Sequence, residues 1–530
     1  MATKYIFVTG GVLSGVGKGV TAASLGAVLK SRGFKVNIQK CDPYFNVDSG
    51  TLNPAEHGEV FVTKDGAETD LDLGHYERFL SSNLTQQSST MSGRIYRQVI
   101  EDERSGKYLG KTVQIIPHVT DAMQEAIISS SKGFDIHIVE VGGTVGDYES
   151  TAFIEAIRQL RLKVGPKNCL YIHVVFLPFL EASQEVKSKP AQNAVRDLRE
   201  AGIICDILVA RADHAVPKNI LKKLSLFGDI PLDRVLALPT VDTIYEVPLI
   251  IEETGIGDIV CKELSLPNKK SKLNDWTKLV SIIKKPNKKA CKVAIVAKYL
   301  DHTDTYSSVV EALKSAAWSF DMDVSIVWVD AEKLTKDNCQ DKFNKIDAIV
   351  VPGGFGNRGI EGKILAAQYA LQNNIPYLGL CLGMQVASIG AIRMAGIKNA
   401  NSTEFDVKSK DPVIDIMESQ KKQKKLGGTM RLGDYKCDIV KGSLAHKMYK
   451  SEHIVERHRH RYEFNPKYTK QLNKGGLVIS GTNPETGLTE IVEAPKHSYF
   501  IATQFHPEFT SRPLKPHPLF AGLIGATQKQ

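Results

Sequence analysis

The fold of the first half of the chain is indicated by the stretch KYIFVTGGVLSGVGKG, residues 4–19. An apolar run, Lys4–Thr9, leads into glycines, and a helical pattern follows from Thr21 to Ser31. A glycine-rich turn between a strand and a helix lets backbone N–H groups converge on phosphate oxygens, and the helix N-terminus adds partial positive charge. We therefore predict a phosphate loop at Gly10–Gly19. A tight turn carrying an ordinary surface lysine, Lys18, is the alternative.

The loop departs from the standard phosphate-loop pattern. The interval from Gly11 to Gly17 is one residue too long, and Gly19 stands where a magnesium-binding serine or threonine is usual. Carboxylates elsewhere can replace that hydroxyl. Glu140 closes a predicted strand, where α/β sheets expose functional residues, and Asp72 lies in an acidic stretch. We expect Asp72 and Glu140 to hold magnesium near Lys18; helix capping is the alternative for Asp72 and for its neighbour Asp70.

The bulk properties predict a large globular protein. At 530 residues, with 42% hydrophobic and 24% charged residues, two or three domains are expected. No apolar run approaches the ~18 residues of a membrane span, and the N-terminus has no signal-peptide pattern. The eight cysteines have neither metal-ligand nor redox-motif spacing, which predicts reduced thiols in the cytosol. A net charge of +9 fits anionic small ligands or weak nucleic-acid attraction.

A second α/β domain is predicted where an apolar run, Cys291–Ala297, restarts the pattern of the N-terminus. The preceding stretch, 265–289, is rich in lysine, asparagine and proline, as exposed connectors are. We predict domains at 1–266 and 291–530, joined by a linker at 267–290. Both should be α/β, with doubly wound, mostly parallel sheets, because short apolar strands alternate with helical stretches. These strands are Ile136–Val141, Tyr171–Phe176, Ile207–Ala210, Val235–Leu238, Ala348–Val351, Ile375–Gly379 and Ser498–Gln504; the basic run Lys421–Lys425 is expected in a solvated loop.

The strongest single signal is PYLGLCLGMQ, residues 376–385. A nucleophile in the pattern G-x-C-x-G at a strand-to-helix turn is held exposed, because the small flanking residues permit a sharp bend. The positive end of the following helix favours the reactive thiolate of Cys381. A buried, inert cysteine is the alternative, which the flanking glycines disfavour.

The expected partners of this cysteine lie far along the chain. His506 and Glu508, in QFHPEF, are two residues apart, so that the carboxylate can orient the imidazole toward the sulfur. The glycine-rich stretch 351–359 offers N–H groups for an oxyanion hole. Together these elements resemble the triad-type glutaminase domain of class I glutamine amidotransferases over residues 291–530, with Cys381, His506 and Glu508 as the catalytic residues.

The complete chain resembles the CTP synthase family, in which an N-terminal amidoligase precedes the glutaminase. The resemblance implies a ligase that phosphorylates the 4-oxygen of UTP with ATP and displaces the phosphate with ammonia from glutamine. It also implies magnesium, feedback inhibition by CTP, activation by GTP, and a homotetramer that can form filaments; neither nucleic-acid nor membrane partners are expected. The segments that carry it are residues 10–19, 40–51, 53–63, 68–79, 139–147, 187–192 and 456–464.

The resemblance also assigns roles to residues. ATP would contact the loop residues Gly15, Val16, Gly17, Lys18, Gly19 and Val20, together with Lys40, Asp72, Thr240 and Val241. UTP would contact Ser14, Lys187, Lys189, Gln192 and Lys223, and inhibitory CTP would contact Asp147, Tyr148 and Glu149. Glutamine would contact Gly354, Leu382, Gly383, Met384, Gln385, Glu404 and Arg461. Arg358 would sense GTP, and His57 and Val60 would line an ammonia passage.

The sequence departs from the family pattern in two places. Tyr148 and the pair Thr151–Ala152 stand where an aliphatic residue and a proline-containing pair are expected near the feedback site. Pro239–Thr240 stands where an acidic residue is more usual beside the adenine. CTP sensitivity and adenine contacts are therefore the properties most open to change.

Three other functions are compatible with parts of the sequence. A ligase that amidates a carboxylate would share both halves, although the cations of residues 187–192 favour a triphosphate acceptor. A non-catalytic nucleotide switch with a degenerate glutaminase is disfavoured by the intact Cys381, His506 and Glu508. The basic segment Arg457–Arg461 could bind RNA, but it is short and lacks interleaved stacking aromatics apart from Tyr462. We expect it to bind glutamine and to face the other domain.

Overall fold

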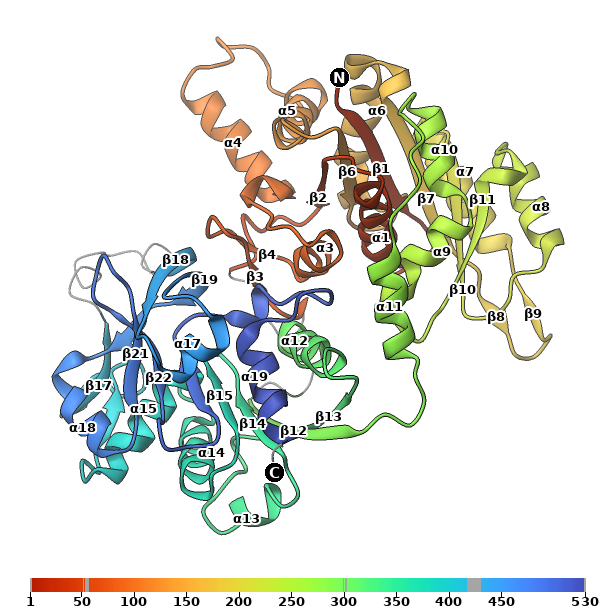
Figure 1. The fold of residues 1–530 in the computed structure, drawn as a ribbon. Coiled ribbons are helices and arrows are strands. Elements are labelled where there is room, and N and C mark those ends of the chain that lie inside the picture. Colours follow the sequence, from red (N-terminus) through yellow and green to blue (C-terminus); the bar gives the residue numbers. More distant parts are fainter. Residues whose placement is uncertain are drawn as a thin grey trace. The chain divides into compact units, whose positions relative to one another are not determined.

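The chain forms two compact units in a computed structural model that describes residues 2–50, 52, 57–298, 300, 303–416 and 430–528 (Figure 1). The first unit contains Met1–Thr51 and Asp72–Ser281, and the second contains Leu52–Leu71 and Ile282–Gln530. The predicted solvated loop at Lys421–Lys425 lies outside the described residues. No described helix is both long and apolar enough to cross a membrane.

The first unit is built on a parallel sheet, in which seven strands pair among the described residues. Their order is β11 (Val235–Pro239), β10 (Ile207–Ala212), β7 (Cys169–Phe176), β1 (Lys4–Gly10), β6 (Ile136–Val141), β2 (Val36–Asp42) and β5 (Ser89–Met91). The central strands β1 and β6 are completely buried, as expected for a parallel sheet covered on both faces. The carboxyl ends of β1, β2 and β6 therefore meet at one edge.

Helices cover both faces of this sheet. One face presents Tyr5 and Phe7 to a core that contains apolar residues of α4 (Ser92–Arg104), α5 (Thr120–Ser130), α6 (Thr151–Val164), α7 (Lys189–Glu200) and α8 (Lys218–Gly228). On the other face, Gly26 of α1 (Lys18–Ser31) lies against Ile38 and Ile138. Helix α1 packs in turn on α3 (Asp72–Leu80), α9 (Val247–Glu253) and α10 (Ile256–Glu263).

The second unit contains a mixed sheet of nine strands within the described part of the chain. Their order is β13 (Asp323–Asp330), β12 (Ala290–Ala297), β14 (Ala348–Val351), β15 (Tyr377–Leu380), β23 (Phe500–Thr503), β22 (Thr489–Glu493), β21 (Val478–Thr482), β18 (Arg431–Ile439) and β19 (His453–His460). The strands from β13 to β23 are parallel, and those from β23 to β19 are antiparallel. The sheet thus combines the predicted parallel strands with an antiparallel half, in which β21, β22 and β23 follow one another through short connections.

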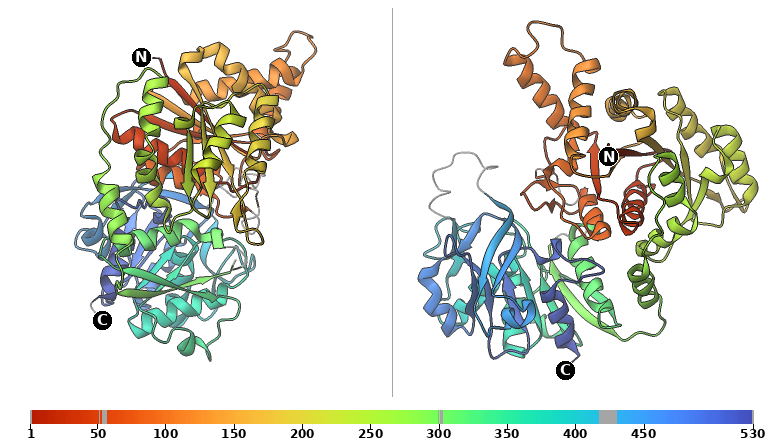
Figure 2. Two further views of the ribbon diagram at one scale, coloured as in Figure 1. Left: turned by 90° about the vertical axis from the view of Figure 1, so that its right-hand side faces the viewer. Right: turned by 45° about the horizontal axis from the view of Figure 1, so that its top comes forward.

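Helices flank this sheet on both faces as well (Figure 2). One core includes residues of α13 (Cys339–Lys342), α14 (Ile360–Asn373), α15 (Leu382–Met394) and α18 (Thr469–Lys474), and the other includes residues of α12 (Ser307–Trp318), α17 (Leu444–Tyr449) and α19 (Pro518–Thr527). A small sheet contains β16 (Ala400–Ser402), β17 (Asp411–Ile416) and β20 (Tyr462–Phe464). Two short hairpins pair β3 (Phe61–Val62) with β4 (Glu68–Thr69), and β8 (Phe179–Leu180) with β9 (Glu185–Val186).

The two units differ from the predicted domains at two points. The predicted linker contains a helix, α11 (Asn274–Ile283), which buries Trp276, Leu279 and Val280; the Trp276 ring stacks on Phe79 at 5.5 Å. The flanking lysines and prolines concealed this amphipathic stretch. In addition, residues 52–71 belong by their contacts to the second unit, although the sequence places them inside the first domain.

Candidate active sites

The phosphate loop connects β1 directly to α1 and adopts an unusual backbone. Gly15 and Gly17 have φ angles of 72° and 95°, which glycine tolerates because it has no Cβ. Val12 has a φ angle of 80°, a strained conformation for a β-branched residue. Such strain persists where the surrounding structure holds it, and it clusters at functional sites.

Lys18 is the first residue of α1, and its side chain is buried beneath the loop. A Cβ atom at Gly10 would lie only 2.6 Å from Lys18 Cδ, so the lysine stem lies against the loop backbone. Its Nζ donates to Gly143 O at 2.8 Å. Burial lowers the pKa of Lys18, while the nearby Glu140 carboxylate opposes the shift.

Gly19 stands at the loop position where a magnesium-binding serine or threonine is usual, and the structure shows why a glycine is present. A Cβ atom at this position would lie 3.0 Å from Asp72 Oδ1. The carboxylate of Asp72 therefore occupies the space that a serine or threonine side chain would need. The absence of a side chain at Gly19 thus leaves room for the carboxylate of Asp72 on α3.

A cluster of charged residues surrounds Lys40, at the end of β2. Its Nζ contacts the carboxylate of Asp72 directly and lies 3.3 Å from Glu140 Oε2 and 3.6 Å from Asp42 Oδ1. Burial opposes the charge on Lys40, but Asp42, Asp72 and Glu140 outweigh it and hold the lysine pKa well above its usual range. Burial would raise the pKa of Asp72, but Lys40 holds it below its ordinary value. Oxygens of these carboxylates thus converge on a single cation.

Helix α7 approaches the same loop and carries two of the predicted residues, Lys189 and Gln192. A Cβ atom at Gly11 would lie 2.4 Å from Ala194 Cβ, which shows how closely this helix approaches. Lys189 is its first residue, and Gln192 Nε2 donates to Ser188 Oγ at 2.9 Å. Lys187 pairs with Glu185 on β9, and the exposed Lys223 lies on α8.

The turn that precedes α6 carries Asp147, Tyr148 and Glu149, and the Tyr148 side chain is 99% exposed. The neighbouring Thr151 begins α6, and its hydroxyl donates to Asp147 O at 3.3 Å. A proline is readily accommodated in the first turn of a helix, so the departure at 151–152 leaves the helix start in place.

Sequence reasoning missed Arg211, at the carboxyl end of β10. A Cβ atom at Gly17 would lie 3.3 Å from Arg211 Nε, and the guanidinium donates to Pro239 O and Thr240 Oγ1, both at 3.3 Å. Thr240 in turn donates to Asp213 Oδ1 at 2.6 Å, and Val241 follows it in the chain. An acidic group thus stands next to Thr240 although residue 240 itself is neutral. The Arg-Ala-Asp sequence at a strand end was the available signal.

In the second unit, Cys381 occupies a sharp turn between β15 and α15. Its φ and ψ angles are 52° and −101°, outside the helical and extended regions. Both flanking glycines are sterically required: a Cβ at Gly379 would lie 2.8 Å from the Gly383 backbone, and one at Gly383 would lie 2.2 Å from Val351 O. This is the geometry of a nucleophile elbow.

His506 and Glu508 lie beside this turn. His506 Nδ1 and Glu508 Oε1 are 2.7 Å apart, and both residues are buried. A Cβ atom at Gly353 would lie 2.9 Å from His506 Cε1 and 3.7 Å from Cys381 Cβ, so both side chains border this glycine. Burial opposes the imidazolium, but Glu508 and the Cys381 sulfur outweigh it and raise the pKa of His506 to about 10.

This pKa predicts how Glu508→Gln will change thermal stability. A raised folded-state pKa contributes stability that is complete below the unfolded value of about 6.5 and is lost as pH rises through about 10. Glu508→Gln removes the main charge responsible. The wild-type Tm should therefore exceed that of Glu508→Gln most at pH 6, and the difference should shrink toward pH 10. Scanning calorimetry measures it.

The exposed pair Lys436–Glu485 provides the control for this experiment. The variant Glu485→Gln should change Tm by a small and nearly pH-independent amount. A Tm difference for Glu508→Gln that grows with pH would contradict the assignment of charge to His506.

Two buried lysines that sequence reasoning missed hold the glycine-rich loop 352–359. Lys298 Nζ donates to Phe355 O at 2.5 Å and to Gly356 O at 2.9 Å, and Lys363 Nζ donates to Pro352 O at 2.9 Å. Burial lowers the pKa of Lys298 to about 8. Because these carbonyls face the lysines, the loop backbone is held in one orientation, as an oxyanion hole requires.

Several of the predicted glutamine residues lie at the elbow or contact the glycine-rich loop. Leu382, Gly383, Met384 and Gln385 form the first turn of α15, and Gln385 Nε2 donates to Tyr462 O at 3.0 Å. Glu404 accepts from Gly356 N at 2.8 Å; burial raises its pKa, while the Gly356 amide, Lys298 and Arg461 oppose the rise. A missed residue, Gln504, donates from Nε2 to Cys381 Sγ at 3.7 Å. Gly354 lies against Lys298, whereas Arg358 forms an exposed ion pair with Glu332.

The basic segment Arg457–Arg461 continues β19 to the start of β20. Arg457, His458 and His460 are buried. His458 Nε2 and His460 Nε2 lie 2.7 and 2.6 Å from carboxylates of Glu490 and Glu463. Because these three side chains are buried, they cannot contribute the exposed positive charge that RNA binding needs.

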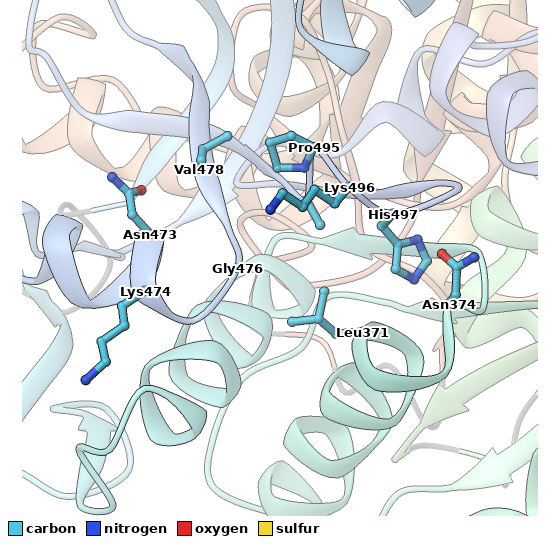
Figure 3. Close-up of a pocket in the computed structure, with 10 residues that line it drawn as sticks. Leu371, Asn374, Asn473, Lys474, Gly476, Val478, Pro495, Lys496 and His497 are labelled. Atoms are coloured by element: carbon cyan, nitrogen blue, oxygen red, sulfur yellow. The ribbon is translucent and has the colours of Figure 1, made fainter.

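A separate cavity of about 590 Å³ lies elsewhere in the second unit (Figure 3). Its lining contains none of the candidate site residues described above. It combines apolar side chains with amides and cations: Leu371, Asn374, Asn473, Lys474, Gly476, Val478, Ala494, Pro495, Lys496 and His497. His497 is already engaged there, with Nε2 3.0 Å from Ala370 O and Nδ1 accepting from Tyr499 N.

Comparison with known proteins agrees with this two-part architecture. The family model described as CTP synthase N-terminus matches residues 4–266, and the class-I glutamine amidotransferase model matches residues 301–526. Proteins named CTP synthase are 53% identical in Carboxydothermus hydrogenoformans (99% of each chain covered) and 51% in Roseiflexus sp. (99% of this chain, 95% of that protein). The one in Methanocaldococcus jannaschii is 50% identical, covering 99% of this chain and 98% of that protein.

Among solved structures, the glutaminase domain of Trypanosoma brucei CTPS with bound acivicin is 42% identical. The match covers 45% of this chain and 94% of the solved chain, with a TM-score of 0.43.

The fold and the matched families define the protein as a glutamine-dependent ligase, with an amidoligase domain followed by a class I glutaminase. More particularly, the chain belongs to the CTP synthase family.

Proposed function

We propose that the protein converts UTP to CTP with ATP and glutamine, and that its two units divide the work. The observation that carries this proposal is the presence, in one chain, of a cysteine elbow beside a His–Glu pair and a phosphate loop beside convergent carboxylates. One arrangement suits release of ammonia, and the other suits phosphoryl transfer.

In the glutaminase unit, the Cys381 sulfur attacks the side-chain amide carbon of glutamine. The S–C bond forms, the C–N bond breaks, and His506 gives its proton to the leaving nitrogen, releasing ammonia. Water then adds to the thioester with His506 as base, the C–S bond breaks, and glutamate leaves as the thiolate of Cys381 is restored. Loop 352–359 stabilises the oxyanion, while Leu382–Gln385, Gly354, Glu404 and Arg461 hold the substrate.

In the amidoligase unit, Lys18, Lys40 and the loop backbone bind the phosphates of ATP, and Thr240 and Val241 contact its adenine. The 4-oxygen of UTP attacks the γ-phosphorus, and ADP leaves. Ammonia then adds at C4 and inorganic phosphate departs, giving CTP. Phosphorylation is needed because a carbonyl oxygen is a poor leaving group.

Asp72 and Glu140 fit a magnesium ion. Their oxygens already converge on the Lys40 ammonium, and Gly19 leaves room for the Asp72 carboxylate next to the loop. Carboxylate oxygens are suitable magnesium ligands. Bound magnesium would neutralise charge on the transferring phosphoryl group.

The cations of α7 and α8 suit the triphosphate of the pyrimidine nucleotide. UTP is bound by Lys187, Lys189, Gln192, Lys223 and Ser14, and inhibitory CTP shares this region with Asp147–Glu149.

GTP activates through Arg358, and His57 and Val60 line the ammonia passage. The enzyme is a homotetramer that can form filaments. It acts in the cytosol, in keeping with eight buried cysteines, all in the described part of the chain and none in a disulfide.

Turnover of UTP tests the proposal. The purified protein, given ATP, magnesium, glutamine and GTP, should convert UTP to CTP, with stoichiometric ADP, phosphate and glutamate measured by chromatography. Omitting UTP should abolish ADP formation. Amidation of a carboxylate acceptor without turnover of UTP would overturn the proposal and favour the other class of amidoligase.

A further inference from the structure

The β3–β4 hairpin belongs to the second unit although the sequence on either side of it belongs to the first. It pairs Phe61 with Thr69 and Val62 with Glu68, and the Phe61 side chain is completely buried. Three residues after β4 ends, the chain reaches Asp72 at the start of α3. A segment that leads to the amidoligase carboxylates thus packs within the glutaminase unit.

Aromatic contacts connect this hairpin to the triad histidine. The Phe61 and Phe509 rings meet edge to face, with centroids 5.0 Å apart and an interplanar angle of 65°. Phe509 stacks almost flat on the His506 imidazole, at 5.0 Å and 15°. Phe509 therefore has the imidazole as one neighbour and Phe61 as another, and it is itself buried.

Strand β19 fixes the hairpin. Arg457 Nη1 donates to Val62 O at 3.0 Å, and its guanidinium lies 5.6 Å from the Phe61 ring centroid. Arg459 forms an ion pair with Glu68 at 2.7 Å. The same strand contacts the triad, because Arg457 O accepts from His506 N at 2.8 Å and Arg459 O lies 3.7 Å from Cys381 Sγ.

We propose that Phe61 is a positioning residue for glutamine hydrolysis, and that it acts through Phe509 on the orientation of the His506 ring. This inference rests on the proposed role of Cys381, His506 and Glu508. The carboxylate of Glu508 contacts the imidazole at Nδ1, and this one contact does not by itself fix the tilt of the ring. Phe509 opposes that tilt, and Phe61 prevents Phe509 from moving away.

The expected effect is on turnover rather than on glutamine binding. Displacing a catalytic group by about 1 Å can cost on the order of 100-fold in rate. In the full-length protein, Phe61→Ala should lower kcat for glutamine hydrolysis by about 10- to 100-fold, with KM for glutamine changed by less than about threefold. CTP synthesis from ammonium chloride should be unchanged. Both are measured with ATP, UTP and GTP present.

A double-mutant cycle tests the route through Phe509. If Phe61 acts only through that ring, Phe61→Ala should lower kcat by less than about twofold once Phe509→Leu is already present. Multiplicative effects of the two substitutions would overturn the proposed route. A second variant, Phe61→Leu, is included in case the alanine variant folds poorly, because leucine keeps most of the buried volume. It should still lower kcat by at least about threefold.

Two controls separate the possible failures. Phe343→Ala removes another buried aromatic residue of this unit, which contacts Tyr369, and it should lower Tm while leaving kcat unchanged. Cys381→Ala should hydrolyse no glutamine; if it remains active, the proposed triad itself is wrong. An inactive Cys381→Ala together with normal kcat in both Phe61 variants would overturn only the positioning role.

Discussion

Replacing Cys381 with alanine should abolish CTP synthesis from glutamine while synthesis from ammonium chloride continues. The loss should be on the order of 10⁴-fold or more, as for removal of other catalytic nucleophiles. The physical reason is that no other group at the elbow can form the thioester. Exogenous ammonia bypasses this step and reacts at the phosphorylated pyrimidine. Parallel assays with the two nitrogen sources measure both effects.

Cys339→Ala is the matched control for this variant. Cys339 is also buried in the second unit, on α13, but it lies outside the elbow. It should keep both activities. If Cys381→Ala lost glutamine-dependent and ammonia-dependent synthesis together, the division of labour between the two units would be wrong.

Replacing Asp72 with asparagine should instead lower CTP synthesis from both nitrogen sources. Asp72 is one of the carboxylates that converge on Lys40, and an amide is a far weaker magnesium ligand. Metal stabilisation of phosphoryl transfer is worth several kcal/mol, so we expect a loss of about 10²- to 10³-fold. Initial rates over a magnesium titration measure this loss, and the magnesium requirement should rise.

The exposed end of α4 provides the comparison, where Asp102 pairs with Lys107. Asp102→Asn removes a similar charge and should leave synthesis unchanged. Alkylation of Cys381 by iodoacetamide should proceed at the normal rate in Asp72→Asn. An Asp72→Asn protein that keeps ammonia-dependent synthesis at the wild-type level would refute the metal assignment.

Features that depend on local geometry could be predicted from the sequence. The elbow was predictable because Gly379 and Gly383 are required at fixed distances from Cys381, where any Cβ would meet backbone. The His506–Glu508 contact was predictable because the two residues are only two positions apart in one short turn. Parallel strands in the first unit followed from buried apolar runs alternating with helices.

Other parts of the sites depend on residues brought together from distant positions. Lys298 and Lys363 carry no motif, and Arg211 has only the short Arg-Ala-Asp sequence as a signal. The contacts of all three appear only when the loops that they touch are in place. The helix α11 was hidden among lysines and prolines, and the antiparallel half of the second sheet followed from connections that composition does not reveal.

The amino-acid sequence alone determined which residues can do chemistry, because nucleophile, base, loop lysine and carboxylates must be of particular types at particular spacings. Only the tertiary structure decided which of them share a neighbourhood. Packing placed Asp72 in the space left by Gly19, and it placed residues 52–71 in the unit opposite to the one their position suggests. Such choices depend on long-range burial and steric fit, which no local pattern encodes.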